Sequence, residues 1–294
     1  MAMFAEIFAV IAPIFVLAGL GFIWAKRGLA FPMDAIGQLA THIGTPCLVI
    51  STLLKAELPR AELGWMALSA VSATLCFVVI GFFALRLLGL PWRSYLAPMA
   101  FPNSGNAGLS LCLFAFGAPG LALGLVCFAL NSFCNFSIGQ ALYAGRGNWI
   151  GLLRAPVIYA VPIGVLGNQF QVELPLFLMR SLETAGAITI PLMLLTLGVS
   201  LASLRVQDLR NALTLTALRL GMGFAVGLAL TWAFGMTGVA RGVLIIQCAM
   251  PVAVINVIFA VRYARDATAV AGLVVVSTLV SFATLPLLLL IALG

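Results

Sequence analysis

Charged side chains are scarce in this sequence. They make up 8% of its 294 residues, whereas 63% of the residues are hydrophobic. A soluble domain is typically about one quarter charged and about half apolar, so this composition excludes an ordinary soluble protein. The charges fall between long apolar runs, which excludes a transmembrane barrel, because barrel strands alternate apolar and polar residues. We therefore predict an all-α integral membrane protein.

Acidic residues are missing from the middle of every apolar run, and His42 is the single histidine. Acids inside the membrane are the usual carriers of protons or sodium, so their absence argues against an antiporter centred on a carboxylate. The sequence also offers no nucleophile–base pair and no set of metal ligands. We therefore expect no enzyme, no catalytic residues, no metal site and no cofactor. The net charge of +7 includes no run of Lys or Arg, so no nucleic-acid partner is expected.

Apolar segments of about 20 residues, the length that crosses a bilayer, predict ten membrane-spanning helices. They lie at residues 4–25, 35–54, 64–88, 95–116, 120–143, 151–170, 182–203, 211–234, 239–262 and 268–292. The connections between them are too short for a soluble domain. The first run lacks the basic start of a signal peptide and is interpreted as the first span.

The fourth predicted span contains an unusual stretch, from Phe101 to Gly108, with one Pro, two Gly, two Asn and one Ser. Proline removes a backbone donor and clashes with the preceding helical turn. Unpaired backbone groups are costly in hydrocarbon, so a helix breaks there only if protein or a water-filled cavity receives the freed groups. We therefore predict a helix that is broken at Pro102 beside a binding site.

Proline residues recur at similar spacings along the chain. The pairs are Pro13 and Pro156, 143 residues apart, Pro46 and Pro191, 145 apart, and Pro102 and Pro251, 149 apart. This recurrence predicts two five-helix repeats, at residues 1–147 and 148–294. Because five is odd, the second repeat is inverted, as in many secondary transporters. Helices 4 and 9 then carry equivalent breaks, at Pro102 and Pro251, and are expected to cross near the bilayer midplane.

The basic residues predict the orientation of the chain. Eleven of the 15 Lys and Arg residues, Arg219 among them, are assigned to positions on or beside the loops after odd-numbered spans, and Lys55, Arg60, Arg180 and Arg241 lie on the other side. Basic residues are enriched in cytoplasmic loops. The distribution therefore places the odd loops in the cytoplasm and both termini on the non-cytoplasmic side.

The run from Pro102 to Gly108, with Thr45-Pro46 in the second span and Pro251 in the ninth, resembles the auxin efflux carrier family of membrane transporters. Its bacterial members include permeases of the malate and malonate type. The short link at Ala144–Asn148 favours this compact prokaryotic branch, and hence the bacterial inner membrane, over the plant hormone exporters. The resemblance implies a fold like that of bile-acid and sodium–proton transporters, with helices 4 and 9 unwound at proline and crossing.

The resemblance also implies two functional parts. A scaffold holds spans 1, 2, 6 and 7 and can form a homodimer. A transport part holds spans 3–5 and 8–10, and it moves as a unit.

Broken helices direct positive dipole ends and free N–H groups at the break, which suits an anion. Amides can complete such a site, and Asn131 and Asn135 share a helix face. The predicted substrate-binding residues are Asn103, Ser104, Gly105, Asn106, Asn131, Asn135, Gln247, Asn256 and Thr45. As alternatives, the amides only cap the broken ends or bond between helices, and the Thr45 hydroxyl bonds its own backbone.

These features predict a secondary active transporter of small organic anions, with a carboxylate bound at the crossing and elevator-type alternating access. One alternative is a sodium-coupled symporter of an amphipathic organic anion, since unwound carbonyls can coordinate sodium. Another is a ligand sensor that keeps the fold without turnover. His42 could couple transport to protons near neutral pH or be an ordinary satisfied polar group, so sodium and proton coupling both stay open.

Overall fold

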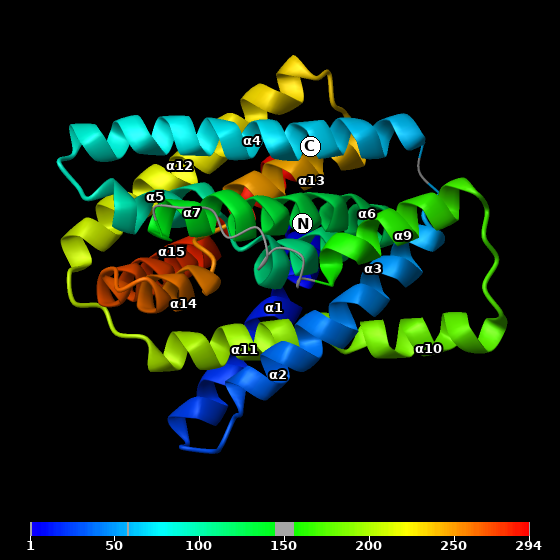
Figure 1. Cartoon of the computed structure of the whole chain (residues 1–294), viewed down its shortest axis with the longest axis horizontal. Coiled ribbons are helices and arrows are strands. Elements are labelled where there is room, and N and C mark those ends of the chain that lie inside the picture. The colour runs from blue at the N-terminus through cyan, green and yellow to red at the C-terminus, as the bar shows by residue number, and fades with distance from the viewer. Residues whose placement is uncertain (1, 58, 145–155, 294) are drawn as a thin grey trace.

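The computed structural model describes residues 2–57, 59–144 and 156–293. These residues form helices joined by short connections, and no strand is found among them (Figure 1). The all-α prediction is therefore confirmed. The predicted boundary between the two repeats, at residues 147 and 148, lies outside the described residues.

Within the described part of the chain, six helices are long and apolar enough to cross a membrane. They are Ile7–Lys26, Ala61–Leu87, Ser104–Ala144, Leu176–Ser203, Leu209–Ala233 and Ala267–Leu293. Four of these lie in single α-helices: α1 (Ala2–Lys26), α4 (Arg60–Leu87), α12 (Leu209–Ala233) and α15 (Ala267–Leu293). The protein is an integral membrane protein, because helices of this length and hydropathy bury their surface in lipid.

Several predicted spans are built from consecutive helical pieces. The second consists of α2 (Met33–Leu39), the π-helical turn η1 (Ala40–Gly44) and α3 (Thr45–Leu54). The seventh consists of α10 (Leu176–Ala187) and α11 (Thr189–Ser203), and α9 (Val157–Gln169) covers the described part of the sixth.

The longest helical stretch turns sharply inside α6 (Ser110–Cys134), which continues into η3 (Asn135–Gly139) and α7 (Gln140–Ala144). Gly117 has φ 63° and ψ −148°, a conformation that glycine adopts without a steric penalty. This turn falls between the predicted spans 95–116 and 120–143, so a single stretch of helix accounts for the end of one and the whole of the other.

The helices are interrupted at both predicted prolines. α5 (Trp92–Ala100) ends before Pro102, and helix resumes at η2 (Ser104–Leu109). α13 (Gly238–Ala249) ends before Pro251, and α14 (Ile255–Arg262) follows it. The two extended segments pair, with an antiparallel bridge between Pro102 and Val252.

Two sets of helices pack closely, and α6 contacts members of both. α1 packs along α11, and α3 packs against α9 and α10. α12 contacts α4, α13 and α15, and α6 contacts α4 and α13. In Figure 1, α4 runs across the upper part of the molecule and α11 and α10 across the lower part, with α5, α6 and α7 between them and α2 projecting below α11. The paired breaks lie beside α4, α6 and α13, and η2 also contacts α11.

Candidate functional site

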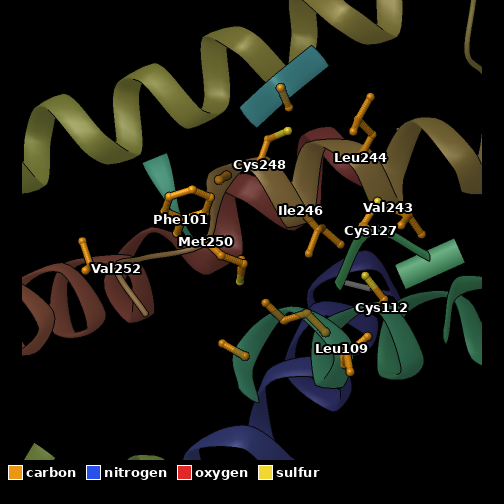
Figure 2. Close-up of a cluster of buried hydrophobic side chains, with 14 of the residues drawn as sticks. Phe101, Leu109, Cys112, Cys127, Val243, Leu244, Ile246, Cys248, Met250 and Val252 are labelled. Carbon is orange, nitrogen blue, oxygen red and sulfur yellow. The ribbon is translucent and has the colours of Figure 1, made fainter. Parts of the chain in front are cut away.

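The two helix breaks satisfy part of each other's backbone. The Asn103 N–H donates to the Pro251 carbonyl at 2.7 Å, and the Ala253 N–H donates to the Phe101 carbonyl at 3.5 Å. Figure 2 shows Phe101 beside Met250 and Val252, where α13 gives way to extended chain. Because no water is available in hydrocarbon to receive unpaired backbone groups, this pairing fixes where the two segments meet.

Asn103 and Asn256 bond backbone groups at the two breaks and keep unused polar atoms. Asn103 Oδ1 accepts from the Asn106 N–H at 3.2 Å, while its buried Nδ2 has no partner. Asn256 Nδ2 donates to the carbonyls of Phe101 at 3.4 Å and Ala253 at 3.1 Å, while its buried Oδ1 has no partner. Asn103 therefore caps η2, whereas Asn256 lies inside α14 and ties its start to Phe101, and each amide keeps one polar atom free for a further partner.

Asn131 and Asn135 both lie beside the first break. Asn131 Nδ2 donates to the Pro102 carbonyl at 3.2 Å and to Ser104 Oγ at 2.7 Å. Asn135 Oδ1 is buried without a partner, and Gly139 is crowded by that oxygen and by the Phe101 ring. The shared face predicted from their spacing is therefore directed at the helix break.

A small cavity of about 30 Å³ lies next to the crossing. Four of the predicted residues line it: Pro102, Ser104, Asn131 and Gln247. The remaining lining residues are Ala70, Ala73, Thr74, Phe77, Cys127, Leu244 and Cys248. Gln247 Nε2 lies 3.6 Å from Cys112 Sγ, and its buried Oε1 has no partner. This volume admits about one water molecule.

The other predicted residues lie outside the cavity lining. Gly105 packs against the Phe128 ring, since a Cβ on Gly105 would be 2.8 Å from that ring. Asn106 is half-buried in η2. Thr45 is buried, and its hydroxyl donates to the Ala40 carbonyl of its own helix at 2.8 Å. His42 is exposed on η1, where its Nδ1 is 3.2 Å from the Gln38 carbonyl. The structure therefore does not bring Thr45 or His42 to the crossing.

Residues that sequence reasoning missed complete the surroundings of the second break. Ser277 Oγ accepts from the Val252 N–H at 3.2 Å, and the Tyr143 hydroxyl donates to the Asn256 carbonyl at 3.3 Å. Their own spans showed no signal beyond a hydroxyl in an apolar run, which is too common to single them out.

The assignment of Arg219 to a cytoplasmic loop is wrong. It lies within α12, ten residues after Leu209, and is 0% exposed. Its Nη2 donates to the Cys248 carbonyl at 2.9 Å, and its guanidinium carbon lies 4.5 Å from the centroid of the Phe77 ring. The available signal was its place eight residues inside the predicted span 211–234. Without Arg219, ten basic residues remain on the side predicted to be cytoplasmic and four on the other, so the predicted orientation is unchanged.

No group of three or more His, Cys, Asp or Glu side chains that could hold a metal ion occurs in the part of the chain that the structure describes. The chemistry available at the crossing is therefore that of amides, hydroxyls, backbone groups and helix termini, with one buried arginine behind them.

Paired helix breaks inside a membrane-spanning helical fold, beside a small cavity that Asn131 and Gln247 help to line, are features that membrane transport proteins use. Residues 144–289 match the model of the family described as "Membrane transport protein". An uncharacterized transporter of Methanothermobacter thermautotrophicus is 25% identical over 291 residues, covering 93% of this chain and 94% of that protein. One of Methanocaldococcus jannaschii is 22% identical over 269 residues, covering 86% and 87%.

The match covers the second half of the chain, and it confirms the resemblance to the auxin efflux carriers that the Pro102–Gly108 run predicts. Both relatives are archaeal transporters.

Proposed function

We propose that the protein is a secondary active transporter of small organic anions, with a carboxylate bound where the interrupted helices meet. The observation that carries this proposal is the pairing of the two breaks immediately before the helix starts at Ser104 and Ile255. The start of a helix carries roughly half a positive charge, and its free N–H groups suit an anion. The unpaired Asn103 Nδ2 is a further donor at the same place.

The size of the cavity supports a moving mechanism. About 30 Å³ is far too small for an organic anion, because ligand pockets commonly measure about 300–1,000 Å³. Substrate entry therefore requires the surrounding helices to move apart. In the proposed elevator, spans 3–5 and 8–10 carry the crossing past a scaffold of spans 1, 2, 6 and 7. The close packing of α1 on α11 and of α3 on α9 and α10 is in keeping with that division.

The proposal includes the finer architecture predicted from the sequence. The chain would form ten membrane-spanning helices in two inverted repeats, at residues 1–147 and 148–294. Both termini would lie on the non-cytoplasmic side of a bacterial inner membrane, and the scaffold would be the site of any homodimer contact. Cysteine labelling from each side of intact cells tests the orientation.

A ligand-dependent thermal-shift screen tests the substrate class. Purified protein is heated with a panel of mono- and dicarboxylates, and at least one is expected to raise the melting temperature. Asn103→Ala and Asn106→Ala should abolish that response and uptake while the protein still folds. Asn211→Ala, which removes an amide that bonds Asp208 at the start of α12, is the matched control. Normal transport by both site variants would contradict the site assignment.

The coupling ion is a separate part of the proposal. Extended backbone at Phe101–Asn103 and Met250–Ala253 provides carbonyls of the kind that coordinate sodium in transporters. Uptake that is unchanged when potassium replaces sodium would exclude the sodium-coupled alternative. The exposed position of His42 predicts that His42→Gln leaves uptake unchanged under an imposed pH gradient.

A further inference from the structure

Arg219 is a buried cation in the middle of a membrane span. It lies ten residues after the start of α12 and fourteen before its end, and it is 0% exposed. Among the described residues, no carboxylate pairs with Arg219. The ion pair found among them is the surface contact between Lys55 and Glu183. An unpaired charge in such a place is costly, and ionisable residues inside membranes mark functional sites by default.

The contacts of Arg219 leave much of its bonding capacity unused. One nitrogen, Nη2, donates to the Cys248 carbonyl, while Nε and Nη1 are buried without a partner. The Cys248 carbonyl lies at the end of α13, where the helix dipole is negative, so this contact offsets only part of the charge. A guanidinium kept only for structure would be expected to use more of its five N–H donors.

Both groups that contact Arg219 also border the cavity at the crossing. Phe77 and Cys248 line the cavity, and the guanidinium stacks on the Phe77 ring. The positive charge thus lies directly behind two residues of the cavity lining. Helix α12 approaches α13 closely here. Gly223 permits this approach because a Cβ at its position would overlap the Cys248 carbonyl.

We infer that Arg219 is the charge-selecting residue of the crossing: it holds an uncompensated positive charge behind Phe77, and this charge makes the cavity favour anions over neutral molecules of the same shape. The inference rests on the proposed function, since it concerns the same site. The substrate's carboxylate is the counter-ion that the protein itself does not supply. Arg219 acts through space and through Phe77, so it is a specificity-determining residue without being a required contact of the substrate.

The test compares Arg219→Met, which removes the charge at similar length, with Arg219→Lys, which keeps it. Arg241→Met is the matched control, because Arg241 is on α13 and also donates to one backbone carbonyl, that of Ile291, at 3.0 Å. Each protein is titrated with the carboxylate that most stabilises the wild type and with its neutral primary amide (for malonate, malonamide). Melting temperature without ligand and binding affinity are both measured.

The expected result has three parts. Arg219→Met melts no lower than Arg241→Met, because removing an unpaired buried charge is often neutral or stabilising. It binds the carboxylate at least about tenfold more weakly than the wild type, as loss of a nearby unit charge predicts, while its affinity for the amide is unchanged. Arg219→Lys retains most of the preference for the carboxylate.

The remaining outcomes separate a failure of the inference from a failure of the proposed function. If the wild type responds to a carboxylate and Arg219→Met binds it equally well, the inference fails and the proposed function stands. If no carboxylate affects the wild type, the proposed function fails, and the inference fails with it. If Arg219→Met does not fold, Arg219→Lys decides: retained carboxylate preference supports the inference, and its loss or a second folding failure overturns it.

Discussion

The contacts of Asn131 make a sharp prediction, because the chain contains a matched control for them. Asn131→Ala removes two amide hydrogen bonds, to the Pro102 carbonyl and to Ser104 Oγ. Asn168→Ala also removes two, to the carbonyls of Leu54 and Ala56, each at 3.0 Å. The first pair joins α6 to the helix break, and the second joins α9 to the end of α3.

The expected loss of stability is similar for the two variants. Side-chain hydrogen bonds in membrane proteins contribute on average about 0.6 kcal/mol and at most about 1.7 kcal/mol each. Two bonds therefore give a loss of about 1–3 kcal/mol, which lowers the melting temperature by roughly 2–4 °C per kcal/mol. The effects on ligand binding should differ, because only Asn131 lines the cavity and holds Ser104 in place.

Thermal-shift titration with the best carboxylate of the screen separates the two effects. Asn168→Ala should keep the full ligand-induced increase in melting temperature from its lower starting point. Asn131→Ala should lose most of it. Equal ligand responses in the two variants, whether both kept or both lost, would refute the reasoning that places substrate beside Asn131.

Two further predictions concern glycines at close contacts. Gly223→Ala should lower stability by about 1–3 kcal/mol through overpacking, because its Cβ would overlap the Cys248 carbonyl. Its control, Gly221→Ala, has nothing within 4 Å of the added Cβ and should be neutral or stabilising by up to about 1 kcal/mol. Equal melting temperatures of the two variants would contradict the prediction. Gly108→Ala places a Cβ 2.7 Å from Gln247 Oε1, so it should displace the Gln247 side chain and weaken carboxylate binding. Stability should change by about 1 kcal/mol or less. An unchanged carboxylate titration would show that binding does not need Gln247.

The all-helical class and several helix positions were predictable from the sequence because apolar length and proline are local signals. The breaks at Pro102 and Pro251 appear where the prolines predict them, and the turn at Gly117 fills the predicted gap between two spans. The common direction of Asn131 and Asn135 was also predicted from spacing alone, since residues four apart share a face. Signals of this kind need no knowledge of the neighbouring helices.

The surroundings of the site were less predictable because they depend on how helices pack. Thr74 and Phe77 lie in a span that is apolar on all sides, so nothing in the sequence shows which face meets the cavity. The Thr45 hydroxyl bonds its own helix, and His42 faces outward on a π-helical turn. Arg219 was misassigned because counting basic residues for orientation treats each one as a loop residue.

Counterflow in proteoliposomes tests the central claim most directly. Vesicles are loaded with an unlabelled carboxylate from the screen and diluted into a trace of the same compound carrying a radioactive label. The wild-type protein is expected to accumulate the label transiently, and Asn103→Ala, reconstituted in equal amount, is expected not to. Binding without accumulation would identify a sensor rather than a carrier, and full accumulation by Asn103→Ala would contradict a carboxylate site at the crossing of the two broken helices.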